Sequence, residues 1–344
     1  MILAGDVGGT KTSIAVFSSK RNLRKPLAQK TFSSPRFRDI ESLLFEFLSK
    51  NKYSIDQACF AVAGPVIGGK SSITNLPWVI SERQIKRVLG ISSVLLINDL
   101  VATASFVPFL NPNVDYLVLN KGRPVQHGTI AVIAPGTGLG EAFLIWDGKK
   151  YRAFASEGGH SDFAPRDVLQ IELLKYMLQK LDHVSYERVC SGPGLKEIHT
   201  FYHKIVDARE RHAELSKIIT EADDPVPIIV KAALGGGRCD LCEKSLDTFV
   251  AIMGAEASNL ALKIFATNAV YIAGGIPPRI RSALEDGKFV EAITKKGRQS
   301  ELLADIPVYL VLNPDVCLLG AAKLGFEKFS EKGEDRRVHA RHFR

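Results

Sequence analysis

Short runs of consecutive hydrophobic residues alternate along the chain with segments whose hydrophobic residues recur every three or four positions. Residues 2–4, 58–62 and 94–97 are runs of the first kind, a pattern typical of strands buried on both faces of a sheet. Residues 40–48 have the helical period and follow Asp39, which is placed to cap a helix. The alternation of the two patterns predicts an α/β fold.

A plan of strand, glycine-rich turn and second strand occurs twice in the chain. Residues 2–4 and 13–17 flank the first turn, and residues 130–133 and 141–145 flank the second. We therefore expect two related domains that face each other across a central cleft.

The domain boundaries follow from a turn-rich join near residues 111–113 and from a closing helix that returns to the first domain. We predict a small α/β domain of residues 1–110 plus about 313–330, and a large α/β domain of residues 111–312. Residues 331–344 are polar, mixed in charge and without an apolar face, so we expect a disordered tail.

Length and composition exclude several classes of protein. The 344 residues are too many for one ordinary core, and 46% hydrophobic with 24% charged residues is a globular profile. No apolar run approaches the ~18 residues of a membrane helix, the N-terminus lacks a basic leader, and the five cysteines suggest reduced thiols. The net charge of +8 is dispersed and no nucleic-acid-binding motif is present. We expect a cytoplasmic protein without membrane or nucleic-acid partners.

The glycine turns predict a nucleotide site, because glycine reaches positive φ and lets backbone N–H groups converge on phosphate. No P-loop motif is present, and the first turn joins two strands, which excludes a dinucleotide fingerprint. A single turn of this kind is more often structural, but three, each after a buried strand, favour a nucleotide. We assign to it Gly5, Asp6, Val7, Gly8, Gly9, Thr10, Lys11, Gly136, Thr137, Gly138, Gly274 and Gly275.

Two acids stand at strand ends, where open α/β sheets bind ligands. Asp6 precedes the first glycines, and we assign it to Mg²⁺ through water, the alternative being an acid that stabilises the turn. Asp99 follows the strand at 94–97 and is the candidate base that accepts a hydroxyl proton during phosphoryl transfer. The alternative is that Asp99 caps the following helix. Asn98 both donates and accepts, which suits a sugar hydroxyl.

A second polar group consists of Glu157, His160 and Glu187. Two glycines separate Glu157 from His160, so the backbone turns tightly and both side chains can face one ligand. Carboxylates that accept from vicinal hydroxyls suit a neutral polyol. The alternatives are a structural role for His160 and a first-turn helix acid for Glu187.

The pair Cys239-x-x-Cys242 is a single C-x-x-C motif. A structural zinc site needs four ligands, and neither His212 nor Cys190 has metal-ligand spacing to the pair. The sequence therefore predicts no zinc.

The motifs together resemble bacterial glucokinase over residues 1–328. They occur in the family's order: Asp6-Val7-Gly8-Gly9-Thr10, Ala63-Gly64-Pro65, Thr74-Asn75-Leu76-Pro77-Trp78, Ile97-Asn98-Asp99, Gly136-Thr137-Gly138-Leu139-Gly140, Glu157-Gly158-Gly159-His160-Ser161-Asp162-Phe163-Ala164-Pro165, Ser191-Gly192-Pro193-Gly194 and Ala273-Gly274-Gly275-Ile276. The stretches from Glu157 to Pro165 and from Ser191 to Gly194 are the specific ones. Lys11 stands where relatives often carry Asn, the tail after residue 329 matches nothing, and the zinc-binding cysteine cluster of the wider kinase family is missing.

The resemblance implies the actin-like ATPase (ribonuclease H-like) two-domain fold, with ATP and Mg²⁺ as donor system and glucose as acceptor. It implies Asp99 as base and Asn98, Glu157, His160 and Glu187 as sugar ligands. We expect a homodimer that makes glucose 6-phosphate in the first step of glycolysis. The alternative is a kinase of the same fold for another neutral hexose or an amino sugar. A sugar-responsive repressor of this fold carries a DNA-binding domain before the turn that here begins at Gly5, which disfavours that class.

Overall fold

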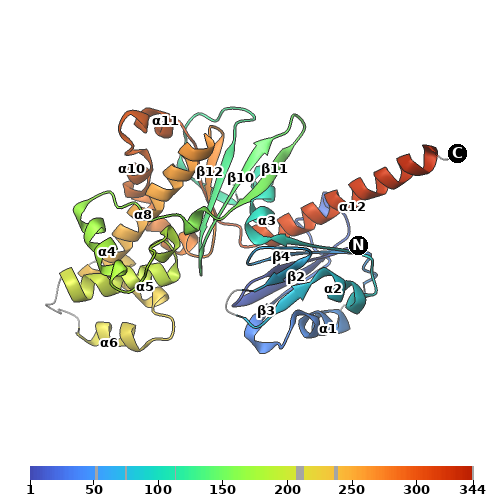
Figure 1. Ribbon diagram of the computed structural model, residues 1–344, viewed down its shortest axis with the longest axis horizontal. Helices are drawn as coiled ribbons and strands as arrows, with labels where there is room; N and C mark the ends of the chain where they lie inside the picture. Colours follow the sequence, from blue (N-terminus) through green and yellow to red (C-terminus); the bar gives the residue numbers. More distant parts are fainter. Residues whose placement is uncertain (51–52, 74–75, 113, 207–212, 236–238, 343–344) are drawn as a thin grey trace. The chain divides into compact units, whose positions relative to one another are not determined.

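The computed structural model describes residues 1–50, 53–73, 76–112, 114–206, 213–235 and 239–342, in two compact units (Figure 1). The first unit is Met1–Leu110 with Asn313–Arg344, and the second is Asn111–Leu312. No helix among these described residues is long and apolar enough to span a membrane.

The first unit contains a five-stranded mixed sheet in the order β3-β2-β1-β4-β7. The β1–β2 and β2–β3 pairs are antiparallel, whereas β1–β4 and β4–β7 are parallel. The strands are β1 Ile2–Val7, β2 Lys11–Phe17, β3 Ala28–Ser33, β4 Gln57–Val62 and β7 Ser93–Asn98, with a small β5–β6 pair at Lys70–Ser72 and Val79–Ser81. The predicted runs at 2–4, 13–17, 58–62 and 94–97 all lie within these strands.

Helices cover the sheet of the first unit and exclude water from its strands. They are α1 Ile40–Lys50, α2 Glu82–Leu89, α3 Asp99–Phe106 and α12 Val316–His342. The apolar face of α1, including Leu43, Leu44 and Phe47, belongs to one buried cluster with Leu3 and Phe60 of the sheet. This burial explains why β1 and β4 are almost purely apolar.

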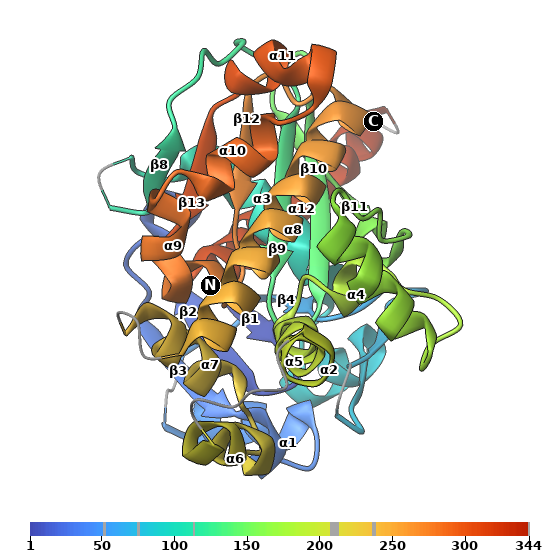
Figure 2. The same cartoon turned by 90° about the vertical axis from the view of Figure 1, so that its left-hand side faces the viewer.

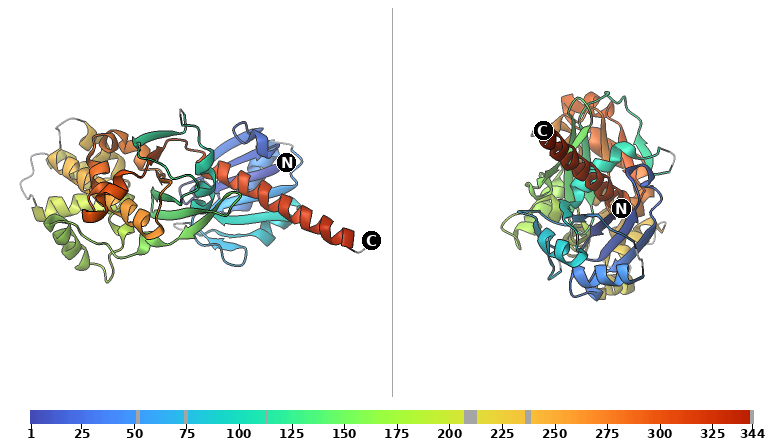
Figure 3. Two further views of the ribbon diagram at one scale, coloured as in Figure 1. Left: turned by 90° about the horizontal axis from the view of Figure 1, so that it is seen from above. Right: turned by 90° about the vertical axis from the view of Figure 1, so that its right-hand side faces the viewer.

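The long helix α12 packs against α3, β1 and β4 (Figure 3). Gly320 permits the contact with α3, because a Cβ there would lie 1.9 Å from the Ala102 carbonyl oxygen. The structure differs from the expected tail, because α12 continues as a helix through His342. A helix already started by packing needs no new nucleus, and the residues after 330 include many Glu, Lys and Arg and no proline.

The second unit contains a six-stranded sheet in the order β11-β10-β9-β12-β13-β8. Its strands are β8 Tyr116–Asn120, β9 Ile130–Pro135, β10 Leu139–Trp146, β11 Tyr151–Ser156, β12 Ala269–Ile272 and β13 Val308–Val311. The order β11-β10-β9-β12-β13 repeats β3-β2-β1-β4-β7, with the same antiparallel and parallel pairs. The two units are therefore built on one sheet plan.

The centre of the second unit is α8, Asp240–Ile264, which packs against the sheet at β9 and β12 (Figure 2). Against α8 pack α5 Gly192–Phe201, α7 Val226–Leu234 and α10 Lys288–Thr294. The other helices are α4 Val168–Leu178, α6 Ala213–Glu221, α9 Arg281–Glu285 and α11 Ser300–Ala304. This core fixes the turns that follow β9 and β12.

Candidate active site

The first glycine turn lies between β1 and β2 and is closed by backbone bonds. Gly8 N–H donates to the Lys11 carbonyl at 3.0 Å, and the Ser34 hydroxyl donates to the Gly8 carbonyl at 2.7 Å. Neither Gly8 nor Gly9 has the positive φ that the sequence predicted. A Cβ at position 8 would lie 3.1 Å from the Lys11 carbonyl oxygen, which is a tight contact. Lys11 itself begins β2 and is exposed.

Asp6, at the end of β1, lies beside a second acid that the sequence did not identify. Burial raises the pKa of Asp6, the negative charge of Asp315 raises it further, and a hydrogen bond from the Cys317 thiol opposes the rise. Gln29 Nε2 holds Asp315 by donating to its Oδ1 at 2.8 Å. The two carboxylates therefore concentrate negative charge next to the first glycine turn.

Asn98 and Asp99 are neighbours at the start of α3, and they make different contacts there. Asn98 is the N-cap, and its Oδ1 accepts from the backbone N–H groups of Leu100 at 2.9 Å and Val101 at 3.2 Å. Its Nδ2 donates to Asp99 Oδ1 at 3.1 Å and to the Gly64 carbonyl at 3.3 Å. Asn98 is thus the N-cap, while Asp99 Oδ1 accepts from the adjacent Leu100 N–H at 2.9 Å and from Asn98 Nδ2.

Cys317 connects the two acids at strand ends. Its thiol contacts the Asp99 carbonyl oxygen at 3.6 Å. Burial raises the pKa of Cys317 well above its ordinary value, and the charges of Asp6 and Asp99 raise it further. Both acids are therefore neighbours of one thiol on α12, at the same edge of the first unit's sheet.

In the second unit, Glu187 and the turn from Glu157 to His160 meet at the backbone of Leu139. Glu187 Oε2 accepts from the Leu139 N–H at 2.9 Å. Gly159 passes so close to Leu139 that a Cβ would lie 2.1 Å from the Leu139 carbonyl oxygen. The structure thus gathers Glu157, His160 and Glu187 around one residue of β10.

Backbone bonds hold these two segments together. Tyr186 N–H donates to the Ser161 carbonyl at 3.0 Å, and Phe163 N–H donates to the Val184 carbonyl at 2.9 Å. The side chains of Glu157 and His160 are exposed, and that of Glu187 is half-buried. Their polar ends are accordingly available to a ligand from solvent.

A buried pair of acids, Glu141 and Glu256, lies next to the turn from Glu157 to His160, and the sequence did not identify it. Burial and the charge of Glu256 raise the pKa of Glu141 to about 8, and burial raises the pKa of Glu256 as well. Asn259 Nδ2 donates to Glu256 Oε2 and to the Tyr186 hydroxyl, both at 2.8 Å. A Cβ at Gly158 would lie 2.0 Å from Glu141 Oε2, so this pair lies directly beneath the turn. No local sequence signal joins positions so far apart in the chain.

The second and third glycine turns meet at the start of α5. Gly192 N–H donates to the Gly136 carbonyl at 2.8 Å, and Ile276 N–H donates to the Pro135 carbonyl at 3.3 Å. Gly274 has the predicted positive φ, 92°, whereas Gly136 and Gly138 do not. Ser191 caps α5 by accepting from the Gly194 N–H at 3.2 Å. Thus the Gly136–Gly138 and Gly274–Gly275 turns present backbone groups beside a helix N-terminus, an arrangement suited to anions.

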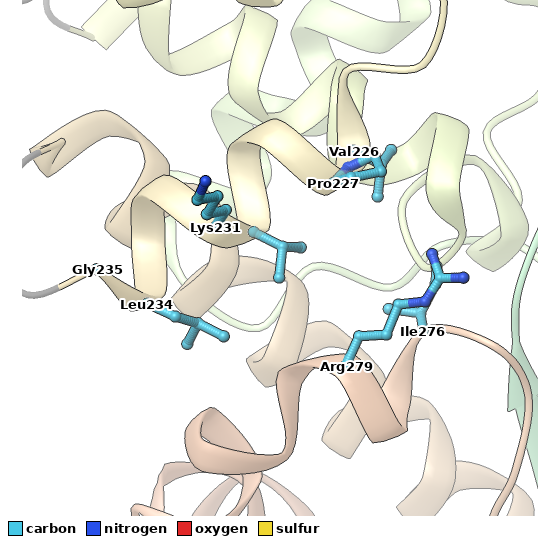
Figure 4. A pocket seen from close by; sticks show the side chains of 8 residues that line it. Val226, Pro227, Lys231, Leu234, Gly235, Ile276 and Arg279 are labelled. Carbon is cyan, nitrogen blue, oxygen red and sulfur yellow. The ribbon is translucent and has the colours of Figure 1, made fainter.

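A pocket of about 510 Å³ opens next to these turns (Figure 4). Val226 and Pro227 at the start of α7 face Ile276 and Arg279, which follow the third turn (Figure 4). Val226 and Ile276 also lie within 4.0 Å of where a Cβ of Gly192 would stand, which connects the pocket to the turns. The walls are largely apolar, with Lys231 and Arg279 as cations, and no local pattern in the sequence indicated this pocket.

Comparison with known proteins places this geometry in a family. The family model described as Glucokinase matches residues 3–327. A curated glucokinase of Nostoc punctiforme is 39% identical over 336 residues, which cover 94% of this chain and 98% of that protein. A crystal structure of glucokinase from an Antarctic psychrotroph has a TM-score of 0.78 and 31% identity, covering 94% of this chain and 98% of that one.

A solved structure with lower sequence identity also shares the fold. A ROK family glucokinase from Streptomyces griseus, solved in complex with glucose and AMPPNP, has a TM-score of 0.62 and 19% identity. It covers 94% of this chain and 98% of that one. These structural neighbours confirm the predicted actin-like ATPase fold.

Proposed function

The chain belongs to the glucokinase family and transfers a phosphoryl group from ATP to D-glucose, and we propose that Asp99 is the base of this reaction. The observation that supports this assignment is the division of functions at α3, where Asn98 caps the helix. Asp99 follows strand β7 and lies near Cys317, which is also a neighbour of Asp6. Its carboxylate is not needed as the N-cap of α3. A carboxylate there accepts the proton of the attacking hydroxyl and aims its oxygen at the γ-phosphorus.

We assign recognition of the sugar to Glu157, His160, Glu187 and Asn98. Glu187 Oε2 is held by the Leu139 N–H, which leaves Oε1 oriented to accept from a sugar hydroxyl. The four hydrogen bonds of Asn98 use both of its donors and both acceptor sites, so a sugar hydroxyl must replace the longest, the 3.3 Å bond to Gly64. Asn98 therefore contributes to binding less than the two glutamates.

We assign the ATP phosphates to the glycine turns and the adenine to the pocket in Figure 4. The Gly136–Gly138 turn and the start of α5 offer N–H groups and a helix dipole to the phosphates. On the first unit, we assign the phosphate contacts to the end of β1, the turn after it and the start of β2, that is to Gly5, Val7, Gly9, Thr10 and Lys11. The apolar walls of the pocket suit a flat base, and Arg279 suits the adjoining phosphates or ribose.

The residues around Asp6 fit Mg²⁺. Burial and the charge of Asp315 raise the pKa of Asp6, and a divalent cation bound through water would favour its carboxylate form. Bound Mg²⁺ supplies neutralisation of the negative charge on the β- and γ-phosphates. The chain's contribution is to hold the carboxylates at the end of β1, with Gln29 orienting Asp315.

An ADP-release assay with a panel of neutral hexoses and amino sugars tests the assignment. We expect D-glucose to have the highest kcat/KM and the sugar dependence to weaken in Glu157 and Glu187 variants. A higher kcat/KM for another sugar would replace glucose as the preferred acceptor. Assembly as a homodimer and a cytoplasmic location stay predictions from the sequence.

A further inference from the structure

Three metal-binding side chains from distant parts of the chain converge inside the second unit. His199 lies near the end of α5, Cys239 is the N-cap of α8, and Cys242 lies in its first turn. One ligand atom of each lies within 4.8 Å of the other two, and all three side chains are buried. Over the described part of the chain, this is the one such group of three. None of its members belongs to the candidate active site.

The cysteine pair has the local geometry of a thiolate site. Cys242 N–H donates to Cys239 Sγ at 3.2 Å, at the N-terminus of a helix of 25 residues. Backbone N–H donors and the helix dipole both favour thiolate over thiol. The structure joins the two sulfurs in a disulfide, which is the oxidised form of the pair and differs from the reduced thiols that the sequence predicted. A metal requires the reduced form, since thiolates are the ligands.

His199 supplies a third ligand. Its Nε2 faces Cys242 Sγ at 3.8 Å. An imidazole nitrogen beside two cysteine sulfurs is a ligand set that structural zinc sites use.

We propose that the reduced protein binds Zn²⁺ through Cys239, Cys242 and His199, with His203 as the fourth ligand. The spacings Cys239-x₂-Cys242 and His199-x₃-His203 both lie in the range of structural zinc sites. His203 follows His199 by about one helical turn, at the junction of α5 with the π-helical segment Tyr202–Val206, and its Nδ1 is buried. His203 is not part of the group that already converges, so its ring turns toward the sulfurs when the metal binds.

Binding of Zn²⁺ to the cysteine pair takes two steps, reduction of the disulfide and then metal binding. A thiol reductant first gives two electrons, and two protons are taken up, to convert the disulfide into two thiols. Zn²⁺ then replaces the two thiol protons, which are released to solvent. Neither His212 nor Cys190 has metal-ligand spacing to the cysteine pair in the sequence, whereas the packing of α5 on α8 brings His199 to it.

The metal would tie the end of α5 to the start of α8. The other end of α5 donates from Gly192 to the carbonyl of Gly136 at the second glycine turn. A zinc cross-link would therefore stabilise the second unit without touching a substrate. This inference does not depend on the assignment of Asp99 or of the sugar ligands.

Elemental analysis of the full chain tests the site. The protein is purified with a phosphine reductant and without chelator, and about one zinc per chain is expected. His199→Ala and Cys239→Ser should lose the metal, and His203→Ala should bind it more weakly. Cys59→Ser, a buried cysteine of the first unit, is the matched control and should retain it.

A second measurement uses wild-type protein, so it tests the site even if the variants fail to fold. Wild-type protein is reduced, stripped of metal and titrated with Co²⁺, whose thiolate charge-transfer absorption reports sulfur ligation, and with Zn²⁺, which should raise Tm. Zinc retained equally by the His199→Ala and Cys239→Ser variants would refute the site. So would reduced wild-type protein that shows neither thiolate absorption with Co²⁺ nor a rise in Tm with Zn²⁺.

Discussion

The backbone N–H of Leu139 donates a 2.9 Å hydrogen bond to the carboxylate of Glu187. The contact joins a proposed sugar ligand to the strand that begins at the second glycine turn. Gly138 belongs to the same arrangement, because a Cβ there would lie 2.5 Å from Glu187 Oε2. One carboxylate oxygen of Glu187 is therefore bound by the turn, and we propose that the other binds the sugar.

Replacing Glu187 by glutamine should separate these two functions. The glutamine carbonyl can still accept from Leu139, but the charged acceptor for the sugar is lost. A hydrogen bond to a charged group contributes about 1.5–3 kcal/mol, so the KM for glucose should rise about ten-fold or more with little change in the KM for ATP. Steady-state kinetics with each substrate varied in turn measures both.

Glu172→Gln is the matched control, because Glu172 is an exposed acid of the same unit that pairs with Lys175. It should change neither constant. Glu187→Ala should raise both, since the turn then loses its acceptor as well. An equal rise of both constants in Glu187→Gln would assign Glu187 to the turn and not to the sugar.

Asp99→Asn should abolish most turnover while glucose binding changes far less. General-base catalysis contributes about 10²–10⁴-fold, and asparagine cannot accept the hydroxyl proton. Helix α3 should remain capped, because its N-cap is Asn98. Turnover is measured by ADP release and glucose affinity by calorimetry.

A control for the helix is available in α4, where Asp167 is the N-cap and accepts from Gln170 N–H at 2.8 Å. Asp167→Asn should keep wild-type turnover, since asparagine caps as well as aspartate. If Asp99→Asn were as active as Asp167→Asn, Asp99 would have no part in the chemical step.

The buried pair of Glu141 and Glu256 should make stability depend on pH. The pKa of Glu141 is raised from 4.5 to about 8 in the folded protein, so the folded state binds the extra proton between these values. Its contribution to stability is complete below about pH 4.5 and is lost as pH rises through about 8. The free energy of unfolding should therefore fall from pH 6 to pH 9.

Glu141→Gln isolates this contribution, because glutamine donates to Glu256 as the protonated acid does but does not titrate. Urea unfolding at pH 6 and pH 9 should show a smaller loss of stability in this variant than in wild type. Glu172→Gln should behave as wild type. An unchanged difference between the two pH values in Glu141→Gln would mean that other groups carry the dependence.

A chain that ends at Ser330 should keep its Tm and its turnover. Within the part of α12 whose burial is described, which ends at Ser330, the last buried residue is Gly325. The sequence after Ser330 is polar and mixed in charge, so it has little apolar surface to bury and should add little to the free energy of unfolding. Calorimetry and the ADP-release assay compare the two chains, and a loss of several degrees would show that this part of α12 contributes contacts.

The hydrophobic pattern was sufficient to predict the strands and the repeated hairpin with its glycine turn. Strands β1, β4 and β9 are mostly apolar because both of their faces are buried, whereas only alternate residues of β7 are fully buried; the apolar signal is local in all four. The positions of Asp6 and Asp99 at strand ends follow from the same pattern.

Local sequence could not choose between Asn98 and Asp99 as the cap of α3, because both side chains cap well. The choice depends on the backbone at Asn98, which is extended while Asp99 is already helical. Likewise, Gly8 and Gly138 lack a positive φ, and a Cβ at Gly138 would displace the Glu187 carboxylate, which only the packed structure reveals.

By itself, the sequence determined the strands, the glycine turns and the family, because these depend on periodicity and on residues that are neighbours in the chain. Tertiary structure alone decided that Glu187 reaches Leu139, that Glu141 lies beside Glu256, and that His199 meets Cys239 and Cys242. Each of these contacts joins elements far apart in the chain. The packing of helices on a sheet creates them, and no local pattern encodes their distance.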